Sequence, residues 1–271
     1  PQYFVNPATF TEKKGNQDLR PLPHVFYALL YRLGKADIEQ EGLLSKALSF
    51  LLDPAGLTKN PANADKEFLV YLHAWAVILH ALVCVALFYL VRAVMRWTAG
   101  RERGGAPPSE RRAALAGFLA AALMAVHPLG SESVNYVCAQ SELMATFFMI
   151  LAVLGYARLV REIDRGTTYL RIVPLVMAIL LMQCCAILSK TTTIVIPVIF
   201  LLYDLFFARK PSLARYLGLP YEANPYPSIL RYLLGLFLRL LPFALFNVAY
   251  LMYRHHLGLT SGPDARGDVT W

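Results

Sequence analysis

Charged side chains are scarce in this sequence. Asp, Glu, Lys and Arg together make up 16% of the 271 residues, while 57% are hydrophobic; a soluble globular domain is about one-quarter charged. Residues 68–91 contain no charged side chain and are long enough to span about 30 Å of hydrocarbon. Further runs of this kind follow. The composition therefore excludes an ordinary soluble domain and predicts an all-α, polytopic transmembrane helix bundle.

Cysteine is also rare, and the common motifs of soluble enzymes are missing. The four cysteines, Cys84, Cys138, Cys184 and Cys185, lie inside apolar runs without the spacing of a metal site, so we expect small core hydrophobes, no disulfide and no metal. There is no Walker loop, no GxSxG and no HExxH. The formal net charge is +8, but the arginines flank apolar runs, where they set membrane topology. We therefore expect a lipid bilayer around the chain and no nucleic acid as a partner.

Six apolar runs are candidate membrane spans, and they divide the chain into three parts. The runs cover residues 68–91, 113–126, 134–157, 172–189, 191–208 and 233–253. Residues 1–67 carry balanced charge and semi-apolar stretches, so we expect an outer-face loop with interfacial amphipathic helices. Residues 68–253 form the expected transmembrane bundle, and residues 254–271 form an outer-face tail. Because the first residue is Pro1 and not Met, we also expect sequence before it.

Arginine is distributed unevenly over the connections between these runs. The connections after the first, third and fifth runs are rich in arginine, whereas the 127–133 loop has no Lys or Arg and the fourth connection has only Lys190. Because cytoplasmic loops carry an excess of Lys and Arg, we predict that the Arg-rich loops are cytoplasmic. Residues 1–67, the 127–133 loop and Lys190 then lie on the outer side, either periplasmic or lumenal.

Polar side chains gather at the junction HPLGSESVNYVCAQSELMATFF. If this stretch is one helix from Ser131, with 100° per residue, Glu132 and Glu142 fall on the same polar face. Ionisable groups at membrane depth usually face a cavity or a partner. Glu132 is explained equally well as an acid near a helix N-terminus, but that explanation does not extend to Glu142. We expect His127, Glu132, Glu142 and Lys190 to face a shared cavity or a packed polar cluster.

Other ionisable residues have competing explanations. Lys190 is either an interfacial lysine that snorkels or a cation that holds a phosphate. Arg239 either binds a head group or snorkels inward. His73 and His80 lie seven residues apart, whereas a helical metal pair needs a spacing of four, so we expect both to be hydrogen-bonded inside the bundle. Asp204, near an inner helix end, is expected to be structural.

Four segments, in the same order, resemble a known family. HPLGSESVNYVCAQSELMATFFMILAVLGYARLVR is similar to the pattern HPLHxESVxxVxxRxELLxxxFxLLALxxYxR, and CAILSKTTTIVIPVIFLLYDLFF is similar to LLAKExxVTLPxVLLLYDLLF. YLHAWAVILHALVCVALFYLV resembles HLxNLLLHALNxxLxFLLL, and FVNPATF…DLRPLPHVFYAL resembles NPxxF…YRPLxxLSYAL. These patterns are typical of the GT-C-type membrane glycosyltransferases that include the transmembrane and TPR-containing O-mannosyltransferases and their bacterial tetratricopeptide relatives.

The resemblance implies a GT-C-like fold and transfer of a sugar from a polyprenyl-phosphate donor to an acceptor at the outer face. The residues that it implies for substrate binding are His127, Glu132, Glu142, Lys190 and Arg20, with Lys190 on the donor phosphate. The family's catalytic acidic pair precedes the segment that resembles QYFVNP. The resemblance therefore places the catalytic residues upstream of Pro1, and none is assigned within the sequence.

Departures from the family pattern favour a second interpretation. Gln140 stands where the pattern has Arg, Thr191 stands where it has an acid or a proline, and no tetratricopeptide array follows Trp271. A protein can keep a fold after losing the chemistry of its ancestor. The alternative is therefore a non-catalytic accessory or structural subunit of a larger membrane protein complex. A transporter is a third hypothesis, which rests only on the few ionisable residues inside the apolar runs.

Overall fold

The computed structural model describes residues 22–23, 25–29, 64–99, 109–135, 139–164, 166–206 and 229–256. In these ranges the regular elements are helices. The long ones are α4 (Ala64–Ala99), α7 (Gln140–Asp164), α8 (Tyr169–Ser189) and α11 (Ile229–His256). The shorter ones are α5 (Glu110–Val126), α6 (Pro128–Asn135), the 3₁₀ helix η4 (Thr191–Val195) and α9 (Ile196–Phe206). The predicted all-α fold is confirmed for the described residues, and its GT-C-like character stays a prediction.

Four helices are long and apolar enough to cross a membrane. These spans are Leu72–Arg96, Gln140–Ile163, Tyr169–Ser189 and Leu233–His256, and they correspond to four of the six predicted runs. The other two runs form α5, which has 17 residues, and the shorter apolar segment Thr191–Phe206. A helix of 17 residues is about 25 Å long, less than the hydrocarbon thickness of about 30 Å. Membrane crossing by these two segments stays a prediction.

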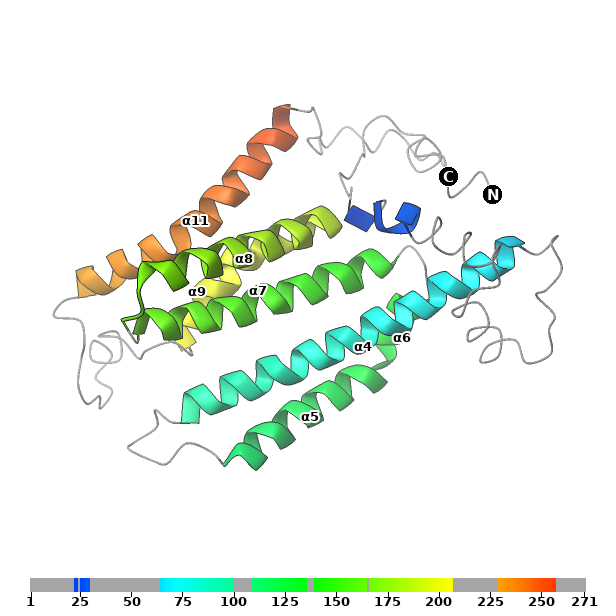
Figure 1. Cartoon of the computed structure of the whole chain (residues 1–271), viewed down its shortest axis with the longest axis horizontal. Helices are drawn as coiled ribbons and strands as arrows, with labels where there is room; N and C mark the ends of the chain where they lie inside the picture. Colours follow the sequence, from blue (N-terminus) through cyan, green and yellow to red (C-terminus); the bar gives the residue numbers. More distant parts are fainter. Residues whose placement is uncertain are drawn as a thin grey trace, which may run out of the picture.

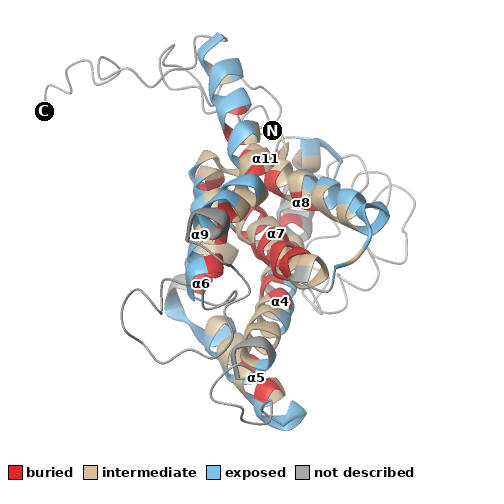
Figure 2. Cartoon of the chain, turned by 90° about the vertical axis from the view of Figure 1, so that its left-hand side faces the viewer, coloured by how far each residue is buried: buried red, intermediate tan, exposed pale blue. Residues whose placement is uncertain are grey.

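The axes of α4, α7 and α8 are roughly aligned, with α8 antiparallel to α7, and α7 lies at the centre of the bundle (Figure 1). α7 packs against α4 on one side and against α8 and α9 on the other. α5 packs on α4, whereas α11 packs on α8 and α9 at the opposite edge (Figure 2). The membrane-length part of α7 is 56% buried, whereas that of α11 is 17% buried. Many apolar side chains of α4, α8 and α11 remain exposed, as a surface in contact with lipid requires.

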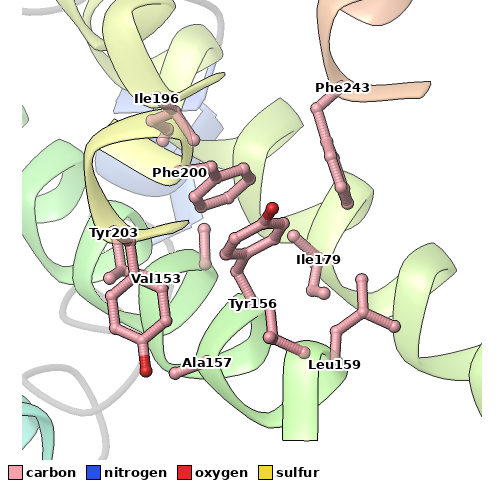
Figure 3. Packing of buried hydrophobic residues seen from close by; sticks show 12 residues of the cluster. Val153, Tyr156, Ala157, Leu159, Ile179, Ile196, Phe200, Tyr203 and Phe243 are labelled. Atoms are coloured by element: carbon pink, nitrogen blue, oxygen red, sulfur yellow. The ribbon is translucent and has the colours of Figure 1, made fainter. Parts of the chain in front are cut away.

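Aromatic side chains from three helices form the centre of the core (Figure 3). The ring of Tyr156 on α7 stacks on the ring of Phe200 on α9, with centroids 4.2 Å apart. Phe243 on α11 meets both rings edge to face. All three side chains are fully buried, and such pairs contribute about 0.5–1.5 kcal/mol each beyond the burial of their area. This cluster therefore fixes α9 and α11 on α7.

α5 approaches α4 closely. A Cβ atom added at Gly117 would lie 2.7 Å from the carbonyl oxygen of Phe88, so a glycine is needed at this contact. At the start of α5, Glu110 accepts a hydrogen bond from Arg92, and its Oε2 lies 3.2 Å from Nε of Arg96. The bond from Arg92 holds the pKa of the Glu110 carboxyl below its ordinary value. Close backbone packing and an exposed ion pair thus join the two helices.

The junction predicted as one helix consists of two. α6 ends at Asn135 and α7 begins at Gln140, so the prediction that Glu132 and Glu142 lie on one helical face is wrong. Asn135, the last residue of α6, is of a type that is favoured at helix ends. Glu142 consequently lies in the first turn of α7.

Part of the predicted outer-face segment is described and packs on the bundle. Residues 25–29 are helical, and the side chains of Leu22 and Phe26 pack against Leu79 and Leu143. This contact lies near the N-terminal end of α7. The remainder of residues 1–63 and residues 257–271 lie outside the described residues, so the predicted boundaries at 67 and 254 stay predictions.

Candidate functional site

Lys190 separates α8 from η4 and stands at one end of the bundle. Its backbone is extended, with φ −152° and ψ 125°, so the helix cannot continue through it. Its N–H group donates to the carbonyl of Ala186 at 2.9 Å, and its own carbonyl accepts from Oγ1 of Thr193 at 2.8 Å. Both backbone groups are therefore bonded, and the break is a defined turn. The side chain of Lys190 is three-quarters buried, with 25% of its surface exposed.

Glu142, in the first turn of α7, is the partner of Lys190. Nζ of Lys190 donates a hydrogen bond to Oε1 of Glu142, and the two form an ion pair. The carboxylate lies near a helix N-terminus and the ammonium lies at the C-terminal end of α8, so each charge also complements a helix dipole. The Glu142 side chain is 49% exposed. A pair with this exposure contributes at most about 1 kcal/mol, so its geometry is easily exchanged.

The residues beneath this ion pair are buried and fixed. Gln140, the first residue of α7, is fully buried, and its Nε2 donates to the carbonyl oxygen of Leu72 on α4 at 2.7 Å. Leu143 and Met144, which follow Glu142, belong to the apolar cluster that Leu22 and Phe26 cover. The residues next to Glu142 in the chain are therefore packed in an apolar cluster. An ammonium and a carboxylate in this position can bind a polar group that approaches from the end of the bundle.

His127 and Glu132 lie on the neighbouring connection between α5 and α7. His127 ends α5, with an extended backbone and an exposed side chain, and Glu132 is exposed on α6. Of these four predicted site residues, Glu142 and Lys190 are in direct contact. Arg20 lies outside the described residues. That all five act at one site stays a prediction.

The two histidines of α4 differ in their surroundings. His80 is half-buried against α6: a Cβ atom added at Gly130 would lie 3.0 Å from its Cε1, and Sγ of Cys84 lies 3.9 Å from its Nε2. His73 is exposed, so the expectation that it is hydrogen-bonded inside the bundle is wrong, because none of the described helices covers that position of α4. Within the described ranges, no group of three or more His, Cys, Asp or Glu is arranged to hold a metal ion.

Two buried amides below Lys190 were missed by the sequence reasoning. Nδ2 of Asn247 on α11 donates to the carbonyl of Ile194 in η4 at 2.6 Å, and Nε2 of Gln183 on α8 donates to Oδ1 of Asn247 at 2.7 Å. A backbone carbonyl in the turn that follows Lys190 is therefore held by α11. The signal in the sequence was a single polar residue inside each of two apolar runs, ILLMQCC and ALFNVAY.

A second ion pair is buried toward the other end of the bundle. Nη1 of Arg239 on α11 lies 3.3 Å from Oδ1 of Asp204 on α9, and Tyr156 donates a hydrogen bond to Oδ2 of Asp204. Asp204 is fully buried and 13% of the Arg239 side chain is exposed. Arg239 therefore pairs with an acid inside the bundle, which neither of the two explanations for Arg239 anticipated. The burial of Asp204 agrees with its expected structural role.

These features define the class of the protein. In the described ranges, four helices of membrane-spanning length, exposed apolar surfaces and ion pairs at the ends and in the core of the bundle are the features of an integral membrane protein. Which side of the membrane each loop faces stays a prediction.

Comparison with known proteins adds a distant relationship. Over 138 residues, 50% of this chain, the sequence is 31% identical to Protein O-mannosyl-transferase TMTC1 of Homo sapiens and 31% identical to the protein of the same name of Mus musculus. The matched segment spans only 14% of the human protein and 13% of the mouse protein. No protein-family profile and no solved structure matches the chain. The matches show a distant relationship to these proteins over half of the chain.

Proposed function

We propose that the chain is part of a GT-C-type membrane glycosyltransferase that transfers a sugar from a polyprenyl-phosphate donor to an acceptor at the outer face. The observation that carries this proposal is the 31% identity to protein O-mannosyl-transferases over half of the chain. The Lys190–Glu142 pair supports it because it offers an accessible ammonium at one end of the bundle.

In the proposed reaction, an oxygen of the acceptor hydroxyl attacks the anomeric carbon of the donor sugar. The new glycosidic bond forms while the bond between that carbon and the phosphate oxygen breaks, and the polyprenyl phosphate leaves. Lys190 holds the phosphate and stabilises the charge that develops on it. The hydroxyl proton passes to a carboxylate of the acidic pair that the resemblance places upstream of Pro1. His127, Glu132 and Arg20 are assigned to the walls of the donor or acceptor site.

The sidedness of the site follows from the distribution of arginine. The 127–133 loop, residues 1–67 and Lys190 belong to the outer side in this proposal, and the Arg-rich loops are cytoplasmic. Lys190, at the C-terminal end of α8, and Glu142, at the N-terminal end of α7, mark that outer end of the bundle.

One observation favours the alternative, a non-catalytic subunit of a larger membrane complex. Gln140 stands where the family pattern has an arginine, and its amide is fully buried on the carbonyl oxygen of Leu72. A side chain that is committed to joining α7 and α4 is not offered to a substrate. In this alternative the chain keeps the helical scaffold, and the Lys190–Glu142 pair only stabilises the turn.

Transfer from a polyprenyl-phosphate sugar, measured with the purified full-length protein, tests the proposal. Lys190→Met keeps the side-chain volume and removes the charge. A hydrogen bond to a charged group is worth about 1.5–3 kcal/mol, so we expect donor affinity to fall roughly tenfold or more. Lys190→Arg retains the charge with a different geometry and should keep part of the affinity.

The possible results separate the two functions. Equal, nonzero rates for the wild type and Lys190→Met contradict the phosphate role. Zero rates for both, together with purification in a stable complex with other membrane proteins, favour the accessory subunit. The thermal stability of Lys190→Met in detergent should hardly change, because the ion pair is partly exposed. A lower rate in Lys190→Met therefore reports on the donor.

A further inference from the structure

The two ion pairs of the bundle differ in a way that bears on binding. The Arg239–Asp204 pair is buried, and the carboxylate is also bonded by Tyr156. The Lys190–Glu142 pair is partly exposed, and Glu142 holds Lys190 through a single oxygen atom. Separation of a buried pair leaves an unsolvated charge, whereas both charges of an exposed pair can be hydrated. Of these two pairs, only the one that contains Lys190 can open at low cost.

The ammonium of Lys190 is also incompletely used. An ammonium group has three N–H donors, and in the described part of the chain the side chain of Lys190 makes a hydrogen bond with Glu142 alone. Its attraction for a second anion is nevertheless weakened, because the Glu142 carboxylate neutralises the pair and repels an approaching negative group. A phosphate therefore gains the full charge of Lys190 only if Glu142 moves away.

We infer that Glu142 is an internal anion that occupies Lys190 in the resting protein and is displaced by a phosphate monoester. The inference rests on the proposed role of Lys190 and adds its regulation. Gln140 and Leu143, which flank Glu142 in the first turn of α7, are buried, so the backbone under Glu142 stays in place while its half-exposed side chain turns toward water.

The displacement has a use in a transfer cycle. A polyprenyl phosphate is both part of the donor and the leaving group, so a lysine with no competing partner would retain the product. When the phosphate begins to leave, Glu142 returns to Lys190 and occupies the place that it vacates. The ion pair lowers phosphate affinity, which favours release of the product.

Binding of farnesyl phosphate and of inorganic phosphate to the full-length protein tests the inference. Calorimetry in detergent compares the wild type with Glu142→Gln, which keeps the shape of the side chain and removes its charge. We expect both phosphates, or farnesyl phosphate alone, to bind about two- to fivefold more tightly to the variant, the factor that corresponds to an ion pair of this exposure. Farnesol, which lacks the phosphate, should show no change.

Two further variants make the test specific. Glu110→Gln is the matched control, because Glu110 is also an exposed acid paired with a cation, but it lies at the opposite end of the bundle; its phosphate affinity should equal that of the wild type. The double variant Glu142→Gln/Lys190→Met should bind like Lys190→Met alone. The inference is overturned if Glu142→Gln weakens phosphate binding, or if it leaves the affinities for farnesyl phosphate and inorganic phosphate unchanged. It is also overturned if Glu142→Gln strengthens binding equally in the Lys190→Met background.

The outcome is independent of the proposed transfer reaction. Tighter phosphate binding by Glu142→Gln, with no transfer activity in any variant, supports the inference about Glu142 and contradicts the proposed glycosyltransferase function. Measurable transfer activity, with phosphate affinities that are the same in the wild type and Glu142→Gln, supports the proposed function and contradicts the inference about Glu142.

Discussion

Arg239 and Asp204 form a buried ion pair, with Nη1 of the arginine 3.3 Å from Oδ1 of the aspartate. The other carboxylate oxygen accepts a hydrogen bond from Tyr156. Residues from α11, α9 and α7 thus meet at one carboxylate, next to the aromatic cluster of Phe200 and Phe243. The pair holds together the same three helices as those rings do.

Removal of one partner of this pair should destabilise the protein strongly. Arg239→Met leaves an unpaired charge on the fully buried Asp204, and breaking a buried pair in this way costs about 3–5 kcal/mol. Thermal unfolding in detergent measures the loss. The double variant Arg239→Met/Asp204→Asn should recover part of it, because no charge is left unpaired. The control Arg111→Met, at an exposed arginine of α5, should remain within about 0.5 kcal/mol of the wild type; an equal loss in the control would contradict the interpretation.

Asn247 should matter for the turn after Lys190. Asn247→Leu removes the donor to the carbonyl of Ile194 and the acceptor for Gln183, which leaves buried polar groups unsatisfied. We expect the free energy of unfolding to fall by about 1–3 kcal/mol. Val248→Leu, at the next and exposed position, is the control and should change the melting temperature little. If the two variants melt together, the amide network does not hold η4.

The contact between α4 and α5 should be sensitive to a single methyl group. In Gly117→Ala the new Cβ would lie 2.7 Å from the carbonyl oxygen of Phe88, so the helices must separate, at a cost of about 1–3 kcal/mol. Gly235→Ala is the matched control in α11, where nothing lies within 4 Å of the added atom. There the better helix propensity of alanine should stabilise the protein by up to about 1 kcal/mol. Opposite shifts in melting temperature are the expected result, and shifts of the same sign would contradict it.

The exposed pair of Glu110 and Arg92 predicts a dependence of stability on pH. Arg92 holds the pKa of the Glu110 carboxyl below its ordinary value of about 4.3. A carboxyl with a lowered folded-state pKa contributes stability above its ordinary pKa, and this contribution is lost as the pH falls through the folded-state pKa. The melting temperature of Glu110→Gln should therefore lie slightly below that of the wild type at pH 7, and the difference should vanish at low pH. A constant or widening difference would exclude this origin.

The proposed orientation can be tested with single cysteines in a cysteine-free background. Glu132 on α6 and Arg111 at the start of α5 are both exposed, and the arginine distribution places them on opposite sides of the membrane. Glu132→Cys should react with an impermeant maleimide added to intact cells, and Arg111→Cys should react only after permeabilisation. The reverse pattern would move every outer-face assignment to the cytoplasm.

The apolar runs were sufficient to predict the long helices, but not their ends. α4 extends from Ala64 to Ala99, beyond both ends of the charge-free run 68–91, because a helix can continue through residues such as Arg92 whose side chains reach water. The break at Lys190 was visible as a charge between two apolar runs. The separation of α6 from α7 was not visible, because the polar residues Glu132 and Glu142 keep the spacing of a single helical face.

The site was predictable as a set of residues and not as a set of contacts. Glu142 and Lys190 stood out because ionisable groups beside apolar runs are costly, but their pairing depends on α7 and α8 packing side by side with opposite directions. Arg239 and Asp204 were noticed separately for the same reason. Gln183 and Asn247 were missed, because an uncharged amide changes the hydropathy of an apolar run only slightly.

The position of Asp204 in the chain has a consequence for how the protein is made. During synthesis, α7 and α9 leave the ribosome before α11, so the carboxylate of Asp204 can reach Tyr156 well before Arg239 exists. The eleven residues of α9 are too few to hold a charged group in the membrane by their own hydrophobicity. A nascent chain that stops between residues 206 and 229 would therefore carry Asp204 without its arginine partner, and the contact of three helices at this carboxylate can form only after α11 has been made.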